Sequence, residues 1–285
     1  MIALASAKGS PGVTVTSLAL AAVWPRPVLV AECDPAGGDL AARWRLPATP
    51  SLLTLAAAAR RRLDPDELWR HTQTLPDPRG PGGGGAGDSG RVRVLLGPLE
   101  AEQASALGRL WSSLGPALAQ VPGTDVLVDC GRIWPGGPTG ELLTEADLVL
   151  LVARPTTEGL AHARSRLLGL EQAGIMAGLV LIGDRPHPLS DVGPALDAVG
   201  VRPALLASLV EDERAAAMLA GGPGSARRLG GSLLVRSARG LAERLLTMPG
   251  GRPAPGALEV AHEAPPQRHQ ARPDWPTSPA TGVVS

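Results

Sequence analysis

One lysine occurs in this chain of 285 residues, and small residues surround it. The segment reads Lys8-Gly9-Ser10-Pro11-Gly12-Val13-Thr14. It lies between an apolar run that ends at Ala5 and a second apolar run at 15–23. Backbone N–H groups in a small-residue loop before a helix N-terminus attract anions, and the helix dipole adds to the attraction. The segment therefore predicts a phosphate-binding loop.

Carboxylates follow two further apolar runs. Glu32 and Asp34 come after the run at 28–31, and Asp129 comes after the run at 126–128. If these runs are parallel strands, their carboxyl ends meet at one edge of the sheet, where α/β proteins bind ligands. We therefore expect Glu32, Asp34 and Asp129 to lie near the loop, at one edge of the sheet.

Strands and helices are expected to alternate along the chain. Strands are predicted at residues 2–5, 28–31, 92–96, 126–128, 148–153 and 179–182. Helices are predicted at 15–23, 52–62, 65–72, 101–120, 158–173 and 232–248, with a shorter αβ unit at 192–206. This order and the apolar character of the strands predict an α/β fold, a mostly parallel sheet with helices on both faces.

Composition limits the remaining possibilities. We expect one domain at 1–248 with a flexible glycine-rich insertion at about 79–90, then a proline-rich disordered tail at 249–285. The formal net charge is zero, so overall electrostatics give no argument for nucleic acid or anionic lipid. No apolar run is long enough to span a bilayer or form a signal peptide, so a cytoplasmic location is expected. Cys33 and Cys130 are expected to be buried thiols.

The loop departs from the standard phosphate-loop pattern G-x-x-x-x-G-K-[ST]. Ala7, Gly12, Val13 and Thr14 align with the four fixed positions, and two of them match. Val13 stands where the pattern has a lysine that neutralises phosphate. Because phosphoryl transfer depends on stabilising negative charge, any hydrolysis is expected to be slow.

A second pattern fits better. The loop resembles the deviant sequence K-G-G-x-G-K-[ST] of the MinD/ParA family of P-loop ATPases, with matches at Lys8, Gly9, Gly12 and Thr14. Residues 28–37 resemble the family's switch segment h-h-h-D-x-D-P-x-G, with Glu32 in place of the first carboxylate. Residues 63–68, 92–98 and 100–107 resemble the branch related to pilus-assembly and septum-site localisation proteins.

The resemblance implies a P-loop NTPase fold that binds ATP with Mg²⁺. Lys8 would act on the nucleotide of its own subunit or across a homodimer on that of the partner, and Asp34 would orient the attacking water; both are implied catalytic residues. Thr14, Asp34 and Asp129 would form the metal site. Nucleotide contacts are implied for Lys8, Gly9, Ser10, Pro11, Gly12, Val13, Thr14, Val15, Asp184 and Arg185. The implied role is a nucleotide-dependent switch, with a protein partner, in chromosome or plasmid partitioning or in placing a division or pilus site.

Other interpretations stay open. A degenerate scaffold of the same fold would dimerise and recruit partners without catalysis, as the Val13 departure favours. Thr14 and Asp129 could instead cap helices or turns, and Asp34 could belong to a plain turn. Arginine runs at 60–62 and 227–228 could contact DNA non-specifically, or simply be solvated. A dinucleotide-binding oxidoreductase is disfavoured because G-x-G-x-x-G is absent after the first strand.

Overall fold

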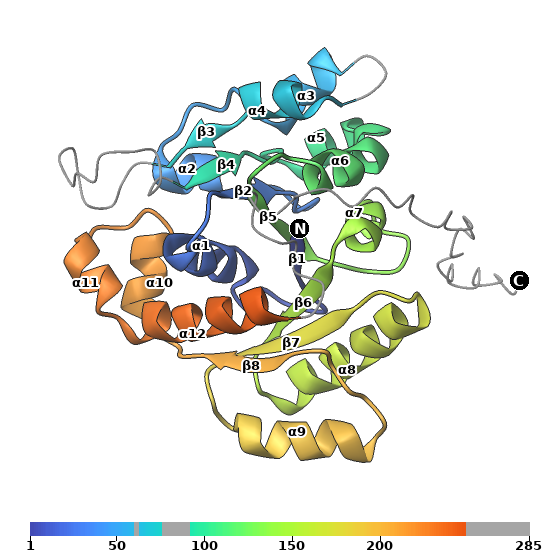
Figure 1. Ribbon diagram of the computed structural model, residues 1–285, viewed down its shortest axis with the longest axis vertical. Coiled ribbons are helices and arrows are strands. Elements are labelled where there is room, and N and C mark those ends of the chain that lie inside the picture. Colours follow the sequence, from blue (N-terminus) through green and yellow to red (C-terminus); the bar gives the residue numbers. More distant parts are fainter. Residues whose placement is uncertain (60–62, 76–91, 249–285) are drawn as a thin grey trace, which may run out of the picture.

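The apolar runs of the sequence form one sheet. The computed structural model describes residues 1–59, 63–75 and 92–248, and in these ranges the strand order is β3-β4-β2-β5-β1-β6-β7-β8 (Figure 1). The strands are β1 (Ile2–Ser6), β2 (Val28–Glu32), β3 (Gln73–Thr74), β4 (Arg93–Leu95), β5 (Asp125–Arg132), β6 (Leu148–Ala153), β7 (Ala177–Ile182) and β8 (Leu206–Leu209). Neighbouring strands are parallel except β3 and β4, which confirms the predicted mostly parallel α/β fold.

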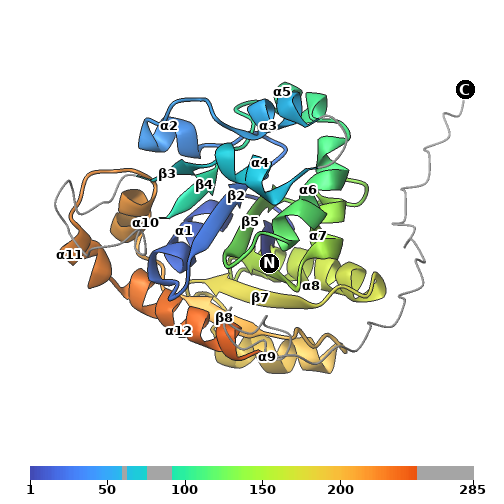
Figure 2. The ribbon, with the colours of Figure 1, turned by 45° about the horizontal axis from the view of Figure 1, so that its top comes forward.

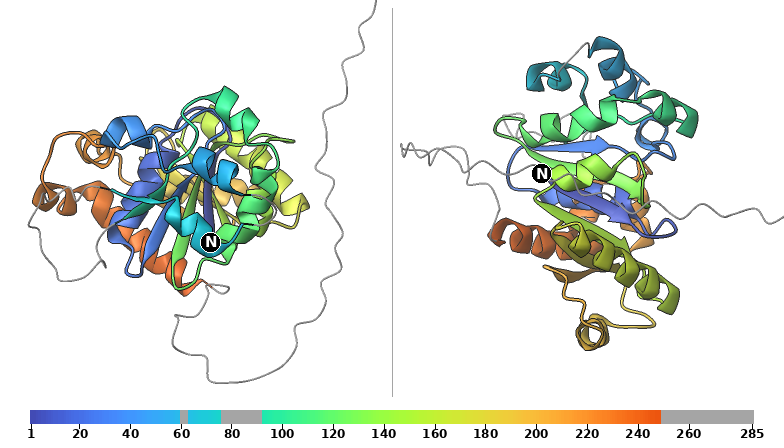
Figure 3. Two further views of the ribbon diagram at one scale, coloured as in Figure 1. Left: turned by 90° about the horizontal axis from the view of Figure 1, so that it is seen from above. Right: turned by 90° about the vertical axis from the view of Figure 1, so that its right-hand side faces the viewer.

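Helices cover both faces of the sheet. One face carries α1 (Val13–Val23), α2 (Leu40–Trp44), α10 (Glu213–Leu219), α11 (Ala226–Gly230) and α12 (Leu233–Thr247). The other carries α3 (Leu52–Ala58), α4 (Pro65–Arg70), α5 (Ala101–Ala106), α6 (Leu110–Ala119), α7 (Gly140–Glu145), α8 (Thr157–Gln172) and α9 (Leu189–Ala198). Figure 2 shows α1 and α12 side by side, and Figure 3 (left) shows α12 and α8 on opposite sides of the sheet.

Alternate side chains of each apolar strand pack into the two apolar clusters on opposite faces of the sheet. Ala3 and Ala5 of β1 pack in the apolar cluster beneath α8, whereas Leu4 between them packs in the cluster beneath α1. All three side chains have no exposed surface. Because both sides of the strand are buried, the sequence there is apolar at every position rather than at every second one.

Some elements differ from the sequence-based expectation. The single helix predicted at 101–120 is two helices, because Gly108 adopts a left-handed conformation with φ of 47° between α5 and α6. Strand β3 was not predicted; it has two residues and pairs antiparallel with β4. The predicted insertion at 79–90 and tail at 249–285 lie outside the described residues. No helix in the described ranges is long and apolar enough to cross a membrane.

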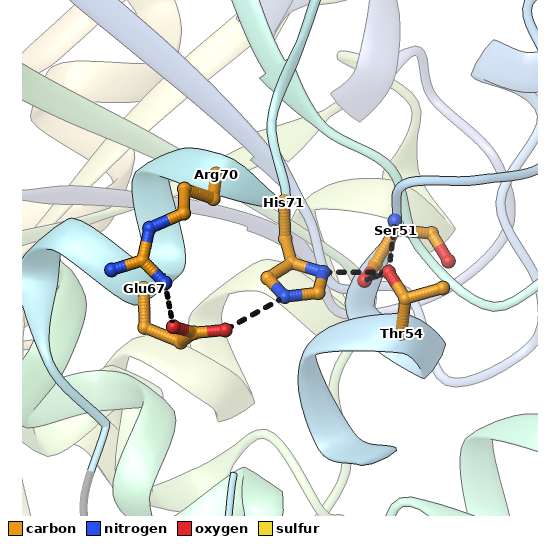
Figure 4. A network of polar contacts seen from close by, with 5 residues as sticks. All are labelled: Ser51, Thr54, Glu67, Arg70 and His71. Atoms are coloured by element: carbon orange, nitrogen blue, oxygen red, sulfur yellow. Dashed lines mark hydrogen bonds and ion pairs between the residues drawn. The ribbon is translucent and has the colours of Figure 1, made fainter. Parts of the chain in front are cut away.

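A polar network joins α3 to α4 near the β4 end of the sheet (Figure 4). Nδ1 of His71 lies 2.7 Å from the Thr54 hydroxyl, and Nε2 lies 3.2 Å from a Glu67 carboxylate oxygen. The Thr54 hydroxyl also accepts from the Ser51 amide at 2.8 Å and donates to the Ser51 carbonyl at 2.9 Å. These bonds cap the start of α3, so the network has a structural role.

Candidate functional site

The loop between β1 and α1 depends on two glycines. Gly9 and Gly12 have φ of 73° and 109°, which side chains of L-residues rarely permit. The Gly12 carbonyl accepts from the Thr16 amide at 2.8 Å and from the Thr16 hydroxyl at 2.9 Å, which begins α1 directly after the loop. Lys8, Gly9 and Ser10 are exposed, and Pro11 is buried beneath them. The loop therefore sits over the N-terminus of α1, as predicted.

The residues at the start of α1 face different ways. Val13 is only 6% exposed and packs in the apolar cluster with Leu4 of β1. The side chain at the standard lysine position therefore belongs to the core. Val15 packs against the same cluster, so it can offer a ligand only its backbone. Thr14 lies between them in the sequence, and its side chain is next to the carboxyl group of Asp129.

Asp129 carries a buried carboxyl oxygen without a partner. The residue is 1% exposed, and its Oδ1 accepts from the Gly131 amide at 3.0 Å. Within the described residues, its Oδ2 has no hydrogen-bond partner. Burial raises the pKa of Asp129 to about 7, although the Thr14 side chain and the Gly131 amide lower it. An unpaired buried carboxylate oxygen is costly unless a cation or donor occupies the site.

The Asp34 carboxyl group packs against Gly131, two residues after Asp129. A Cβ on Gly131, where φ is 57°, would lie 2.0 Å from the Asp34 carboxyl carbon. Asp34 Oδ1 accepts from the Ala36 amide at 2.8 Å, and the Cys33 amide donates to the Asp129 carbonyl at 2.7 Å. Burial raises the pKa of Asp34, while the Ala36 amide and the Arg132 charge lower it. The ends of β2 and β5 thus bring both predicted carboxylates together.

Glu32 is a structural residue. Its Oε1 accepts from the amides of Asp39 at 2.7 Å and Leu40 at 2.9 Å, and its Oε2 accepts from the Gly97 amide at 3.0 Å. Burial raises its pKa, and these three backbone donors oppose the increase. Both oxygens are already engaged, so Glu32 ties α2 and the segment after β4 to β2 and leaves the site chemistry to Asp34 and Asp129.

Lys8 is exposed and lines a cavity between the loop and α8. The cavity is about 220 Å³, and its lining includes Ser10, Pro11, Arg154, Glu158 and His162. Hydrogen bonds from its own amide and from Thr156 lower the pKa of Glu158, and the charge of Lys8 lowers it further. The Lys8 ammonium is therefore near the N-terminus of α8.

Asp184 and Arg185 lie farther from the loop. They follow β7, which is separated from β1 by β6, and both are exposed. In the part of the chain that the structure describes, no hydrogen bond or ion pair joins either residue to the loop. They share the carboxyl edge with the other predicted residues but are not brought together with them.

Sequence reasoning overlooked Arg132 and Trp134. Strand β5 was expected to end near Asp129, but it continues to Arg132, which pairs in register with Ser6. Trp134 follows with 43% of its surface exposed. Their position directly after a predicted site aspartate was the available signal. Cys33 and Cys130 are free and fully buried as predicted, and burial raises the pKa of both thiols.

The fold is that of the MinD and ParA-type P-loop ATPases. MinD of Pyrococcus furiosus, a cell division ATPase, is 20% identical with a TM-score of 0.64, covering 86% of this chain and 97% of its own. A ParA-family ATPase from Chlorobium tepidum TLS is 18% identical with a TM-score of 0.65, covering 85% and 98%. The septum site-determining protein MinD of Pyrococcus horikoshii OT3, complexed with Mg-ADP, is 20% identical with a TM-score of 0.63, covering 86% and 95%. No protein-family profile and no curated protein sequence matches the chain.

Proposed function

We propose that this chain binds ATP with Mg²⁺ at the carboxyl edge of the sheet and acts as a nucleotide-dependent switch. One observation carries the proposal: the buried, unpartnered Oδ2 of Asp129 lies beside Thr14 and across Gly131 from Asp34. The loop of residues 8–14 precedes α1 at the same edge and offers its amides to phosphate. A likeness in fold to an Mg-ADP complex supports the same ligand.

The donor set fits magnesium. The described residues contain no cluster of three or more His, Cys, Asp or Glu side chains that could hold a metal alone. Mg²⁺ needs less from the protein, because it commonly takes one or two protein oxygens together with substrate phosphates and water. The Thr14 hydroxyl and the Asp129 carboxylate would supply those oxygens. Bound Mg²⁺ would offset phosphate charge.

Asp34 is the residue proposed to orient water. Its carboxylate is half-buried and fixed by the Ala36 amide, so it presents an acceptor in a defined position. Such an acceptor orients a nucleophile rather than stabilising transferred charge. Because Val13 supplies no positive charge, we propose that hydrolysis is slow. Slow hydrolysis suits a switch, because a switch acts through its nucleotide-bound conformation and not through the amount of product it forms.

The output we propose is reversible homodimerisation in the cytoplasm. Lys8 is exposed at the loop and would contact the partner's nucleotide. Structural neighbours described as cell division, septum-site and ParA-family proteins favour a role in division-site placement or in partitioning. The sequence resemblance to the pilus-assembly branch adds pilus-site placement as an alternative. Only one of the two states, monomer or nucleotide-bound dimer, would bind a protein partner. Non-specific contact of arginines with DNA is an added possibility for a partitioning role.

Equilibrium binding of ATP and ADP, with and without Mg²⁺, tests this function. Wild type, Lys8→Ala and Thr14→Val would be compared, with oligomeric state read by light scattering in the same samples. Thr144→Val is the matched control, since Thr144 is an exposed threonine of α7. We expect Mg²⁺-dependent ATP binding that Thr14→Val removes, and dimerisation that Lys8→Ala removes. Absence of ATP binding by the wild type at millimolar concentration contradicts the proposal.

A non-catalytic scaffold of the same fold is the second candidate. The packing of Val13 into the core favours it, because a buried valine at this position cannot neutralise phosphate. Single-turnover hydrolysis distinguishes the two. A wild-type rate above that of Asp34→Ala supports the enzyme, whereas equal rates, together with dimerisation that does not require nucleotide, support the scaffold.

A further inference from the structure

The proposed nucleotide site has an excess of negative charge. Asp34 and Asp129 lie at its floor, and the triphosphate of ATP would add further negative charge. Val13 contributes nothing, because its side chain is in the core. The loop amides and Mg²⁺ would offset part of this charge, and a guanidinium is the side-chain group best suited to offset more of it.

Two of the nearby cations are committed elsewhere. Arg154 forms an ion pair with Glu211 at 2.6 Å. Lys8 lines the cavity beside α8, where its charge acts on Glu158. Neither arrangement directs a free positive charge towards Asp34 and Asp129.

Arg132 is differently placed. It is the last residue of β5 and pairs in register with Ser6, the last residue of β1. The Ser6 carbonyl accepts from the Ile133 amide at 3.0 Å, and the Ser6 hydroxyl lies 3.4 Å from the carbonyls of both Gly9 and Gly131. These bonds hold the backbone on either side of Arg132 against the first residues of the loop.

The side chain of Arg132 is exposed at this position, and no ion pair or hydrogen bond engages its guanidinium within the described residues. Its charge acts on Asp34, which lies against Gly131, the residue before it. A guanidinium presents a planar fork of donors, which matches phosphate oxygens. It is thus an uncommitted phosphate-binding group at the mouth of the loop.

We propose that Arg132 binds the phosphate chain of ATP and supplies, from the end of β5, the positive charge that Val13 cannot supply from the loop. This inference rests on the proposed nucleotide-binding function. The cation then approaches the phosphates from the strand that carries Asp129, and the same strand end provides both the metal ligand and the anion ligand.

Calorimetric binding of Mg·ATP, Mg·ADP and AMP to wild type, Arg132→Gln and Arg132→Lys tests it. Arg132→Gln should weaken ATP binding about 10- to 100-fold, as expected for loss of a charged hydrogen bond, and leave AMP almost unchanged. Arg132→Lys should recover part of the loss. Raising ionic strength should weaken ATP binding less in Arg132→Gln than in wild type. Arg202→Gln, which removes an exposed guanidinium paired with Asp197, is the control and should change ATP affinity about twofold at most.

The outcomes separate the two claims. Equal ATP affinity and equal salt dependence in wild type and Arg132→Gln overturn the assignment of Arg132 but leave nucleotide binding intact. Failure of the wild type to bind ATP overturns both. Thermal unfolding of each variant shows whether a loss of binding comes from a loss of fold; if Arg132→Gln unfolds, unchanged affinity in a folded Arg132→Met variant overturns the assignment in its place.

Discussion

The burial of Asp129 costs stability. Its carboxyl group is enclosed by the ends of β1 and β5, and burial raises its pKa from 3.8 to about 7. A structural role alone would not require an ionisable group with one unpartnered oxygen. Such a group is better explained by a cation that binds there, because the cation would stabilise the charged form that burial disfavours.

Replacing Asp129 by asparagine should therefore stabilise the ligand-free protein. The folded pKa is raised above the unfolded value of 3.8, so the carboxyl group disfavours folding increasingly as pH rises from about 4 to 7, and fully above 7. An amide side chain at this position would not titrate. We expect Asp129→Asn to gain up to about 4 kcal/mol at pH 8 and almost nothing at pH 4. Urea unfolding at several pH values measures the difference.

The control for this measurement is Asp197→Asn, which replaces an exposed aspartate paired with Arg202 at the surface. It should change stability by less than about 1 kcal/mol at every pH. If Asp129→Asn is destabilising at pH 8, the carboxylate is stabilising in the ligand-free fold and the argument for a cation site is lost.

The same titration should control magnesium. A protonated Asp129 cannot bind Mg²⁺, and its pKa is about 7. Mg²⁺-dependent ATP affinity should therefore fall up to about tenfold for each pH unit below 7, and level off above it. Binding titrations between pH 5.5 and 8.5 at fixed ionic strength measure this. The Mg²⁺-independent component serves as the internal control, and a flat Mg²⁺ dependence would exclude Asp129 as a ligand.

At the level of elements, the end of β5 determines the site. Gly131 has φ of 57°, and the register between β1 and β5 shifts between Leu4 and Ser6. This irregularity leaves Asp129 beneath the loop and Arg132 at its mouth, and it creates the space that Asp34 fills. A bulge next to a functional site commonly redirects side chains in this way.

Alanine substitutions at two glycines distinguish the cost of backbone strain from the cost of a steric clash. Gly131→Ala adds a Cβ that would meet the Asp34 carboxyl carbon at 2.0 Å, whereas a Cβ added to Gly136, with φ of 72°, would have nothing within 4 Å. Gly136→Ala should cost about 1 kcal/mol from backbone strain alone. Gly131→Ala should cost more, and should also impair nucleotide binding because Asp34 must move. Chemical unfolding and ATP binding of both variants check this; equal effects would show that the Asp34 contact is unimportant.

The sequence predicts the elements better than it predicts the site. Apolar runs at β1, β2, β6 and β7 identify buried parallel strands, and the residues after them identify the carboxyl edge. Periodicity does not reveal that Gly108 interrupts a helix, since glycine also occurs inside helices. Nor does it reveal that Val13 faces the core while Thr14 faces Asp129, because that depends on how α1 docks on the sheet. The proximity of Arg132 to Asp129 in the sequence was a signal, but its place beside the loop depends on the register of β5 with β1.

At the scale of the whole molecule, helices cover both faces of the sheet, and the candidate site lies at its carboxyl edge. Leu99 and Trp134 follow β4 and β5 at this edge, and each has 43% of its surface exposed. Trp134 lies over Gly137, where an added Cβ would meet the indole at 3.2 Å. Exposed tryptophan is enriched among the residues that contribute most to protein interfaces, so Trp134 is the candidate contact at this edge.

Trp134→Ala should therefore weaken ATP-dependent self-association without preventing nucleotide binding. Truncating an interface tryptophan commonly costs about 2 kcal/mol or more, so the dimer dissociation constant should rise at least about tenfold. Sedimentation equilibrium with Mg·ATP measures it. Met176→Ala is the control, because Met176 is 48% exposed but precedes β7 at the opposite edge. If Met176→Ala weakens the dimer and Trp134→Ala does not, the subunits associate through the amino edge, and Lys8 cannot reach a partner's nucleotide.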